Sequence, residues 1–238
     1  MKDAYINAAE NSASHSIICE QFIKGTLVTV DGFCFKNGHQ ALAVASRKHA
    51  DGPKPVTRFI IYPAQFPEDI NDLLLENHNR TVDALGYKYG HTHGEYIITD
   101  SGDIYLVECA NRGGGVYTSS VIVPELTGIN LNNILLKQVL DDDQIEIQNK
   151  GVNFMQKSII LTFLDYTVGK VIKSINVEEM LDKDYTLRFR SKFTENDMVE
   201  SVEDCAQRHS MLVLAGNNAQ ETLQNLEKFK DELIITYY

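Results

Sequence analysis

The stretch from Gly90 to Gly115, GHTHGEYIITDSGDIYLVECANRGGG, constrains the fold more than any other part of the chain. Two short β-rich runs, YII and IYLV, flank Asp-Ser-Gly-Asp at positions 100–103, which has the chemistry of a tight turn. This pattern predicts a β-hairpin that is followed by a run of three glycines.

Each arm of the predicted hairpin carries a carboxylate among apolar neighbours, Glu95 on the first arm and Glu108 on the second. Hairpin pairing brings the two acids side by side, where they either share a proton or hold a divalent cation. Arg112 follows Glu108 by four residues, and the glycines at 113–115 let the backbone approach a ligand closely. Together these residues indicate a site for a metal-bound phosphate. The alternative is a pair of outward-facing strand residues with Arg112 as their salt-bridge partner.

The rest of the chain predicts an α+β fold in which antiparallel strands are interrupted by helices. Before the hairpin we expect a short helix at 3–10 and strands at 17–23, 26–35 and 40–46, with Asn37-Gly38 as a turn signal. Residues 68–85 have helical spacing and end before Gly86, a typical C-cap residue. A second amphipathic helix is expected at 131–140. The positions expected to face inward are Ile70, Leu73, Leu74, Val82 and Leu85 in the first helix, and Leu131, Ile134, Leu135 and Val139 in the second.

The three aspartates at 141–143 mark the best domain boundary in the chain. Residues 17–143 form the predicted main lobe, and residues 1–16 are expected to be the end of a preceding helix and a polar link. Residues 150–238 form a smaller β-rich unit, with strands at 158–164, 170–175, 185–190 and 233–237 and a helix at 219–230. The predicted class is therefore α+β in two parts.

Composition excludes some classes of partner. The chain has 22 basic and 33 acidic side chains and a formal charge of -11, which argues against nucleic-acid binding and against a polybasic membrane anchor. Its four cysteines are scattered along the sequence. The sequence contains no uninterrupted run of about 18 apolar residues, the length that a membrane-spanning helix needs. We therefore expect a cytoplasmic protein with reduced thiols.

Several charged residues outside the hairpin have two interpretations. Asp31, Arg47, Lys48, Lys54 and Arg58 either contact phosphate or are solvated loop charges, and the second interpretation is favoured because charged side chains are mostly exposed.

Four stretches together resemble the C-terminal half of the ATP-grasp fold, as found in carboxylate-amine ligases and carbamoyl-phosphate-synthase-like proteins. CEQFIKG at 19–25 is similar to the hinge segment against which adenine lies, and the hairpin is similar to the paired metal-binding strands. SSVIVPELTGINLNNILLKQVL at 119–140 is similar to the helix that closes the lobe. GKV at 169–171 and QRHSMLVLAG at 207–216 are similar to the small β domain that follows in many members.

The resemblance implies a metal site. Glu95 and Glu108 match the two Mg²⁺-binding carboxylates, with Mn²⁺ as a possible substitute for Mg²⁺. The family commonly has asparagine at the position of Ala110, which cannot bind a metal, so the neighbouring Asn111 is the substitute ligand. One or two ions are both compatible with this set.

The resemblance also implies a nucleotide site. Arg112 matches the cation that steadies the transferred phosphate or the acyl intermediate, and His93 lies where some relatives place a phosphate-directed cation. Glu20, Gln21, Phe22 and Ile23 match the segment that receives the adenine edge.

The activity implied is that of an ATP-dependent carboxylate-amine or carboxylate-thiol ligase that works through an acyl phosphate. Its partners are a nucleotide and a small carboxylate. The lobe that normally precedes the hinge segment does not match any part of this sequence. We therefore expect a weak or inactive isolated chain, a first lobe supplied upstream or by a separate chain, and an apolar surface near 17–23 that favours a homodimer.

Two other functions are compatible with the residues. One is a non-catalytic remnant of the family that works through protein contacts. The other is a zinc-dependent hydrolase, because His91, His93 and Glu95 alternate on one strand face and form a known catalytic ligand set.

Overall fold

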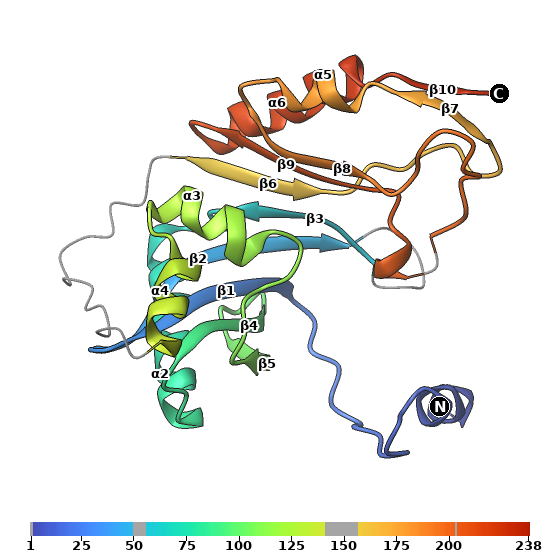
Figure 1. Cartoon of the computed structure of the whole chain (residues 1–238). Coiled ribbons are helices and arrows are strands. Elements are labelled where there is room, and N and C mark those ends of the chain that lie inside the picture. The colour runs from blue at the N-terminus through green and yellow to red at the C-terminus, as the bar shows by residue number, and fades with distance from the viewer. Residues whose placement is uncertain (1, 50–55, 141–156, 203) are drawn as a thin grey trace.

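A computed structural model of the chain describes residues 2–49, 56–140, 157–202 and 204–238. These residues form one sheet of eight strands in the order β5-β4-β1-β2-β3-β6-β9-β8, and β10 pairs with β7 beside it (Figure 1). Every strand pair is antiparallel. The predicted α+β class is confirmed.

The centre of the sheet is the hairpin of β1 (Thr26–Phe35) and β2 (Gly38–His49). Phe35 pairs with Gly38, so the turn consists of Lys36 and Asn37. Gly38 has a φ of 122°, a conformation that L side chains rarely adopt, which explains the Asn-Gly signal in the sequence. On either side, β1 pairs with β4 (Gly90–Ile98) and β2 pairs with β3 (Thr57–Tyr62), and β5 (Ile104–Ala110) lies at the edge.

The register defines two faces of the sheet. Thr29 pairs with Ala45 on β2 and with Glu95 on β4, and these three residues lie on what we call the first face. Their neighbours in sequence, which include Val28 and Tyr96, lie on the second face.

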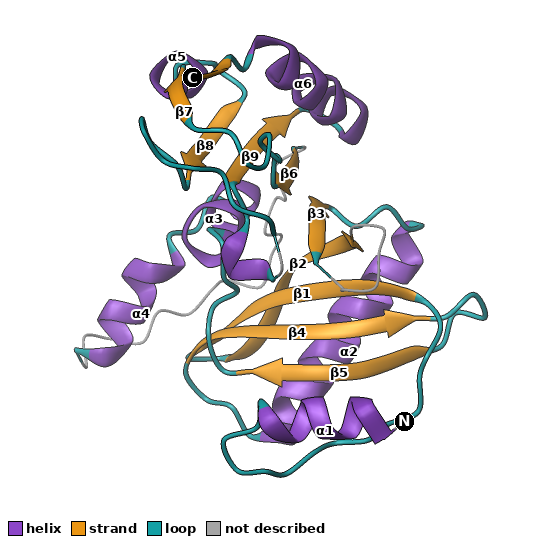
Figure 2. Cartoon of the chain, turned by 90° about the vertical axis from the view of Figure 1, so that its right-hand side faces the viewer, coloured by secondary structure: helices purple, strands orange, loops and turns teal. Residues whose placement is uncertain are grey.

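Helix α2 (Glu68–Leu85) covers the second face, and Figure 2 shows it crossing behind β1, β4 and β5. Its buried residues Leu74, His78 and Val82 are spaced by four, which places them on one stripe of the helix. The predicted bounds and the C-cap at Gly86, with a φ of 72°, are confirmed. The predicted inward positions Leu73 and Leu85 are wrong, because Leu73 lies beside this stripe and Leu85 lies in the last turn, and both are exposed.

A chain of hydrogen bonds between neutral side chains holds α2 to the sheet. Asn79 Oδ1 accepts from the Ala41 N–H and can only accept, so the His39 ring donates from Nδ1 and accepts at Nε2 from the Thr92 hydroxyl. Thr92 in turn accepts from His78 Nε2, and His78 Nδ1 accepts from the Tyr96 hydroxyl. Burial lowers the pKa of His78 to about 3 and that of His39 to about 4, so both rings are neutral.

The first face is covered by a π-helical turn, η1 (Thr118–Ile122), and by α3 (Val123–Thr127) and α4 (Leu131–Val139). Ile122, Leu131 and Ile134 pack there against Phe33 and other residues of the main core. The predicted inward position Val139 is wrong, since Gln138 points inward instead. Its amide donates to the Cys34 carbonyl at 2.7 Å and accepts from the Gly90 N–H at 3.1 Å, which satisfies two backbone groups of the sheet.

The C-terminal part of the chain extends the same sheet. β6 (Ser158–Thr162) pairs with β3, β9 (Ser210–Gly216) pairs with β6, and β8 (Thr186–Ser191) forms the far edge. Helices α5 (Val177–Leu181) and α6 (Ala219–Glu232) bury Met180 and Phe229 against the second face. β7 (Ile172–Ile175) pairs with β10 (Ile235–Tyr237), and a short 3₁₀ turn, η2 (Cys205–Gln207), precedes β9.

The boundary predicted at 141–143 lies outside the described residues. Strands from both predicted units share one sheet, and the division into two domains stays a prediction.

The N-terminal helix α1 (Lys2–Glu10) lies apart from the sheet, to which it is joined by an extended segment (Figure 1). The strand predicted at 17–23 is wrong, because these residues pair with no strand in the described part of the chain. Ile18 and Phe22 are 84% and 89% exposed, so the apolar pattern there reflects an unpaired surface rather than a sheet position. No described helix combines the length and apolarity needed to cross a bilayer.

Candidate functional site

The candidate site begins where β4 and β5 pair. Ile98 pairs with Ile104 and Tyr96 with Leu106, and regular continuation would place Val107 opposite Glu95. A β-bulge at Val107 shifts the register by one residue, so that Glu108 is the partner of Glu95. The bulge therefore places both carboxylates on the first face.

Glu95 belongs to a row of alternating charges on this face. Its carboxylate pairs with Arg47, and it lies 3.7 Å from His93 Nε2. The other ring nitrogen of His93 donates to Asp31 Oδ1 at 2.7 Å, and Asp31 Oδ2 accepts from the Tyr62 hydroxyl at 2.9 Å. Two acids thus alternate with two bases, and the charges of the row balance.

This row fixes the protonation state of His93. Burial by itself lowers the pKa of His93, but hydrogen bonds to Asp31 and Glu95 outweigh it and raise the pKa to about 9. The hydrogen bond from His93 in turn lowers the pKa of Glu95, assisted by Arg47. His93 is therefore a buried imidazolium that lies between two carboxylates.

The interpretation of Asp31 and Arg47 as solvated loop charges is wrong. Asp31 lies on β1 with 3% of its surface exposed, and the Arg47 side chain on β2 is 16% exposed. Arg47 also donates to Thr57 Oγ1 at 2.9 Å, which holds it over β3. Tyr62 was not recognised from the sequence, where an isolated tyrosine at a strand end carries no signal.

The glycine turn closes over the buried end of this row. A side-chain carbon on Gly114 would lie 2.8 Å from Asp31 Oδ1 and 3.0 Å from His93 Nδ1, which leaves room only for glycine. Gly115 has no such neighbours within 4 Å. Val116 and Tyr117 follow with positive φ values of 49° and 68°, and the turn leads directly into η1. The backbone at Gly114 is thus fixed against Asp31 and His93.

The other hairpin residues are more exposed. Arg112 Nη2 lies 3.8 Å from Glu108 Oε1, and both side chains are more than half exposed, so this pair contributes little to stability. Asn111 donates to the Tyr89 carbonyl just before β4 at 2.7 Å and to the His91 carbonyl in β4 at 2.9 Å. This contact extends the hairpin by one residue and leaves only the Asn111 side-chain oxygen for a metal.

The predicted adenine-binding residues lie next to the hairpin. Glu20, Gln21 and Phe22 are exposed, and Ile23 is half-buried. They lead to Gly25, where a side-chain carbon would lie 2.2 Å from the Ile98 carbonyl oxygen at the end of β4. The segment therefore meets the sheet beside the strand that carries Glu95.

The donor set suits a hard divalent cation that keeps part of its hydration. In the described part of the chain, no group of three or more His, Cys, Asp or Glu side chains is arranged to hold a metal. Mg²⁺ is commonly bound by one or two carboxylates, with water and phosphate oxygens completing the octahedron, and Glu95 and Glu108 supply such a pair. A His91, His93 and Glu95 zinc site finds no support, because His91 pairs with Asn132 and His93 with Asp31.

A family model for the ATP-grasp domain matches residues 2–120, which is half of the chain and includes the hairpin and the glycine turn. The chain belongs to the ATP-grasp family.

Solved structures share this ATP-grasp fold at low sequence identity. The L-amino acid ligase from Bacillus licheniformis superposes with a TM-score of 0.77 at 21% identity, covering 92% of this chain and 53% of that one. Phosphoribosylglycinamide synthetase from Anaerococcus prevotii has a TM-score of 0.81 at 15% identity, covering 100% of this chain and 60% of that one. The chain spans little more than half the length of either protein.

A third similar structure contains ligands. It is the biotin carboxylase domain dimer of Hydrogenobacter thermophilus 2-oxoglutarate carboxylase, in complex with MgADP, ADP and bicarbonate. It has a TM-score of 0.77 at 11% identity, covering 99% of this chain and 51% of that one.

Proposed function

We propose that this ATP-grasp chain is the nucleotide- and Mg²⁺-binding portion of an ATP-dependent carboxylate-amine ligase. The observation that carries the proposal is the register of the hairpin, which opposes Glu95 and Glu108 beside Arg112 and a close-packed glycine turn. The L-amino acid ligase among the similar structures supports this class of reaction, and the MgADP in the biotin carboxylase domain supports the ligand.

The proposed metal ligands are Glu95 and Glu108, with the side-chain oxygen of Asn111 as a further candidate. Bound Mg²⁺ would neutralise charge on the phosphate oxygens of the nucleotide. The protein prepares Glu95 for this role, because His93 keeps the carboxylate ionised and restricts its position. We therefore assign His93 as a positioning residue that acts through Glu95, since its buried ring faces carboxylates rather than open solvent.

Arg112 is the proposed catalytic cation. Its guanidinium has no carboxylate closer than Glu108 at 3.8 Å among the described residues, so it is available to an incoming anion. A substrate carboxylate attacks the γ-phosphorus of ATP, forming an acyl phosphate and releasing ADP. The nitrogen of an amine then attacks the acyl carbon, the bond from that carbon to the phosphate oxygen breaks, and inorganic phosphate leaves. The proton lost by the amine nitrogen passes to solvent. Arg112 donates to the anionic group in both steps, and such charge-assisted bonds are among the strongest available.

The segment of Glu20, Gln21, Phe22 and Ile23 is proposed to receive the adenine. Its backbone groups are not used by a sheet, so they are free to pair with the edge of a base, and Phe22 offers an exposed aromatic face. The acidic charge of the chain does not oppose an anionic nucleotide here, because Arg112 and a bound metal would supply local positive charge.

The test is thermal unfolding of the chain with Mg²⁺ and a non-hydrolysable ATP analogue. A ligand at about a hundred times its Kd stabilises the folded state by about 2.7 kcal/mol, which raises the unfolding midpoint by a few degrees. Glu95→Gln and Glu108→Gln should lose this increase. Asp100→Asn, an exposed acid in the turn of the same hairpin, should keep it. No increase for the unmodified chain at millimolar nucleotide would end the proposal for this chain.

A second candidate is a non-catalytic lobe that acts through protein contacts. The exposed Ile18 and Phe22 are compatible with it, because burying apolar side chains against a partner is favourable. This function predicts self-association or partner binding without nucleotide. Sedimentation that gives a monomer at all concentrations would exclude self-association, and a clear nucleotide response would favour the ligase portion over this candidate.

A further inference from the structure

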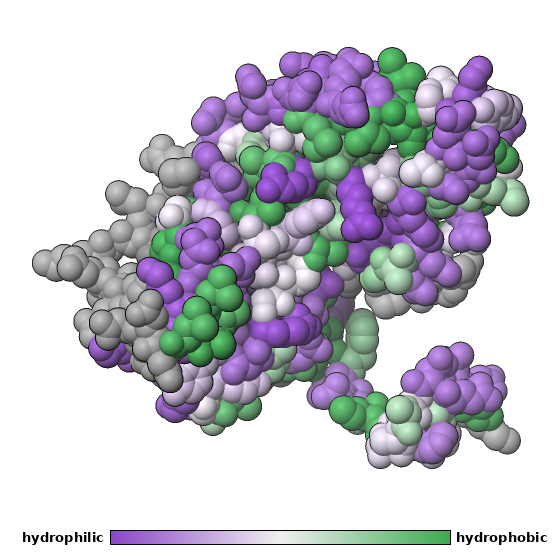
Figure 3. Space-filling view, in the orientation of Figure 1, coloured by the Kyte–Doolittle hydropathy of each residue, from purple (hydrophilic) through white to green (hydrophobic). Residues whose placement is uncertain are grey.

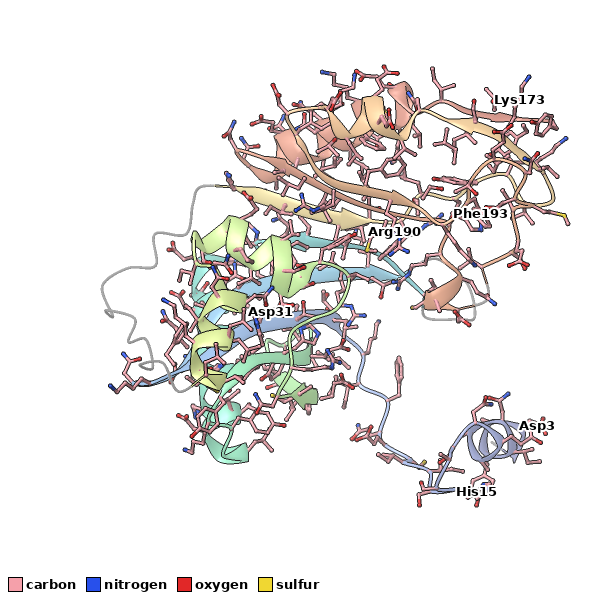
Figure 4. The ribbon with its side chains drawn as sticks, viewed as in Figure 1. Asp3, His15, Asp31, Lys173, Arg190 and Phe193 are labelled. Atoms are coloured by element: carbon pink, nitrogen blue, oxygen red, sulfur yellow. The ribbon has the colours of Figure 1, made fainter. Side chains whose placement is uncertain are left out.

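A pocket of about 280 Å³ lies on the first face at the other end of the sheet, where β8 and β9 meet the end of the glycine turn. Val116 from the turn and Phe163, which follows β6, form part of its wall, and Arg190, Lys192 and Arg208 bring three cations to it. In Figure 4, Arg190 lies between its own strand, β8, and the ends of β2 and β3. Figure 3 shows the hollow between β8 and β9 on one side and the ends of β2 and β3 on the other, with hydrophilic side chains beside it.

The register places this pocket on the same face as the carboxylates. Arg47 pairs with Ile60, Ile60 with Leu161, and Leu161 with Val213, so all four lie on the first face. Met211 lies two residues before Val213 and has the same orientation, and its partner on β8 is Arg190. Arg190 and Glu95 therefore project from one continuous surface, at its two ends.

Arg208 is held in the pocket without a compensating charge. Its guanidinium carbon lies 3.8 Å from the centre of the Phe163 ring, and Nη2 lies 2.8 Å from Cys205 Sγ. Its Nε atom is buried and makes no hydrogen bond within the described residues. A half-buried guanidinium whose Nε is shielded from water and which has no carboxylate at ion-pair distance favours an anion from outside the chain.

The nearby acids do not neutralise the cluster. In the described part of the chain neither Arg190 nor Arg208 forms an ion pair with a carboxylate, and Lys192 lies 4.0 Å from Glu200, whose side chain is 73% exposed. Asp204 acts on Arg208 only at longer range, because it forms no ion pair with it and its Oδ1 faces the backbone N–H groups of Ala206 and Gln207. Three converging cations in a chain with a charge of -11 therefore form a local positive site.

The size and position of the pocket limit what it holds. Its volume of about 280 Å³ is enough for a small anionic group. The pocket is lined in part by Val116, four residues beyond Arg112 on the same turn, and by none of the residues proposed to receive adenine. The turn that carries Arg112 thus leads to the pocket, and a molecule that reacts beside Arg112 would extend along this turn towards it.

We propose that the pocket binds an oxyanion, a carboxylate or a phosphate monoester, carried by the amine substrate. This inference rests on the proposed ligase function and narrows its second substrate to an anionic amine. Arg190 and Arg208 present planar donors that match either oxyanion, and Lys192 adds a point charge.

The test compares three small amines on the whole chain without nucleotide: β-alanine, O-phosphoethanolamine and ethanolamine. Binding is followed by NMR of the methyl groups of Met211 and Ala206, which line the pocket. The Kd obtained from these signals should be at least tenfold lower for β-alanine or O-phosphoethanolamine than for ethanolamine, which has no anionic group. The tighter of the two identifies the oxyanion as carboxylate or phosphate.

Variants show whether the cations are responsible. Arg190→Gln should weaken binding of the anionic amine at least tenfold, the loss expected for one charge-assisted contact. Arg188→Gln is the matched control, because Arg188 is exposed on the same strand, donates to the Leu187 carbonyl at 2.6 Å and does not line the pocket. Arg208→Lys keeps the charge but removes the planar stack on Phe163, and should weaken binding less than Arg190→Gln.

Equal affinity for all three amines overturns the proposal, and so does equal weakening by Arg188→Gln and Arg190→Gln. Arg190→Gln should leave the response to Mg²⁺ and the ATP analogue unchanged. If the chain binds the anionic amine but not the nucleotide, the proposal for the pocket is supported and the proposed ligase function is rejected. If it binds the nucleotide but not the anionic amine, only the proposal for the pocket is rejected.

Discussion

The charged state of His93 gives a direct test of the row that supports Glu95. The pKa of His93 is about 9 against an ordinary value of 6.5. At about 1.36 kcal/mol per unit, this interval corresponds to about 3 kcal/mol of unfolding free energy. Because the folded-state pKa is raised, this stability is fully present below pH 6.5 and is lost as the pH rises through 9. We therefore expect the chain to lose about 3 kcal/mol from this group between pH 6.5 and 9.5.

The assay is urea unfolding of the wild type and His93→Gln at several pH values in this range. Glutamine carries no titrating group, so the variant should lack this part of the pH dependence, and it should be less stable at pH 6.5. The Cys34 thiol, whose pKa burial raises to about 11, titrates equally in both proteins and cancels in the comparison. His15→Gln, at an exposed histidine in the N-terminal link, should behave as the wild type. If the unfolding free energy falls between pH 6.5 and 9.5 by the same amount in His93→Gln and the wild type, to within about 1 kcal/mol, His93 is not a buried imidazolium.

Three further predictions concern packing and the neutral histidine chain. Gly114→Ala should destabilise the chain by about 1–3 kcal/mol in urea unfolding, because its new carbon would crowd Asp31 and His93, whereas Gly115→Ala should have little effect. Equal effects would contradict the close approach of the turn. Leu74→Ala should cost about 2–5 kcal/mol and the exposed Leu73→Ala less than about 0.5 kcal/mol, which tests the orientation of α2. The wild type should lose stability as the pH falls from 6.5 towards 4, because the unfolded chain protonates His78 and the folded chain does not. His78→Phe should reduce that loss. If the variant loses as much unfolding free energy between pH 6.5 and 4 as the wild type, His78 is not neutral in the folded chain.

Much of the fold follows from local patterns. The helix at 68–85, the hairpin at 90–110 and the turn before Gly38 were predictable because each has strong signals at short range: a C-cap glycine, alternating strands and an Asn-Gly pair. The pairing of β3 with β6 was not, because no local signal specifies which strands meet across a hundred residues of chain. The apolar run at 17–23 was misread as a strand for the same reason, since its neighbours in space decide whether it pairs.

The candidate site was predictable in its residue types and not in its geometry. Alternation along β5 places Glu108 on the same face as Leu106, and only the bulge at Val107 turns it towards Glu95. Arg47 and Asp31 lie on strands distant in sequence from β4, so their contacts with Glu95 and His93 depend on the register of two strand pairs, β1–β2 and β1–β4. Charged residues on strands with mostly buried neighbours are the signal that could have identified them.

The pairing of Phe59 in β3 with Thr162 in β6 also has a consequence for the order of folding. The hairpins β1–β2 and β4–β5 close over short stretches of chain, whereas β6 must find β3 after a loop of about a hundred residues has formed, at a higher entropic cost. During synthesis the strands up to β5 leave the ribosome first, and β3 then presents an open edge until β6 arrives. The β3 edge is therefore where we expect an unfinished chain to be most prone to pair with another molecule.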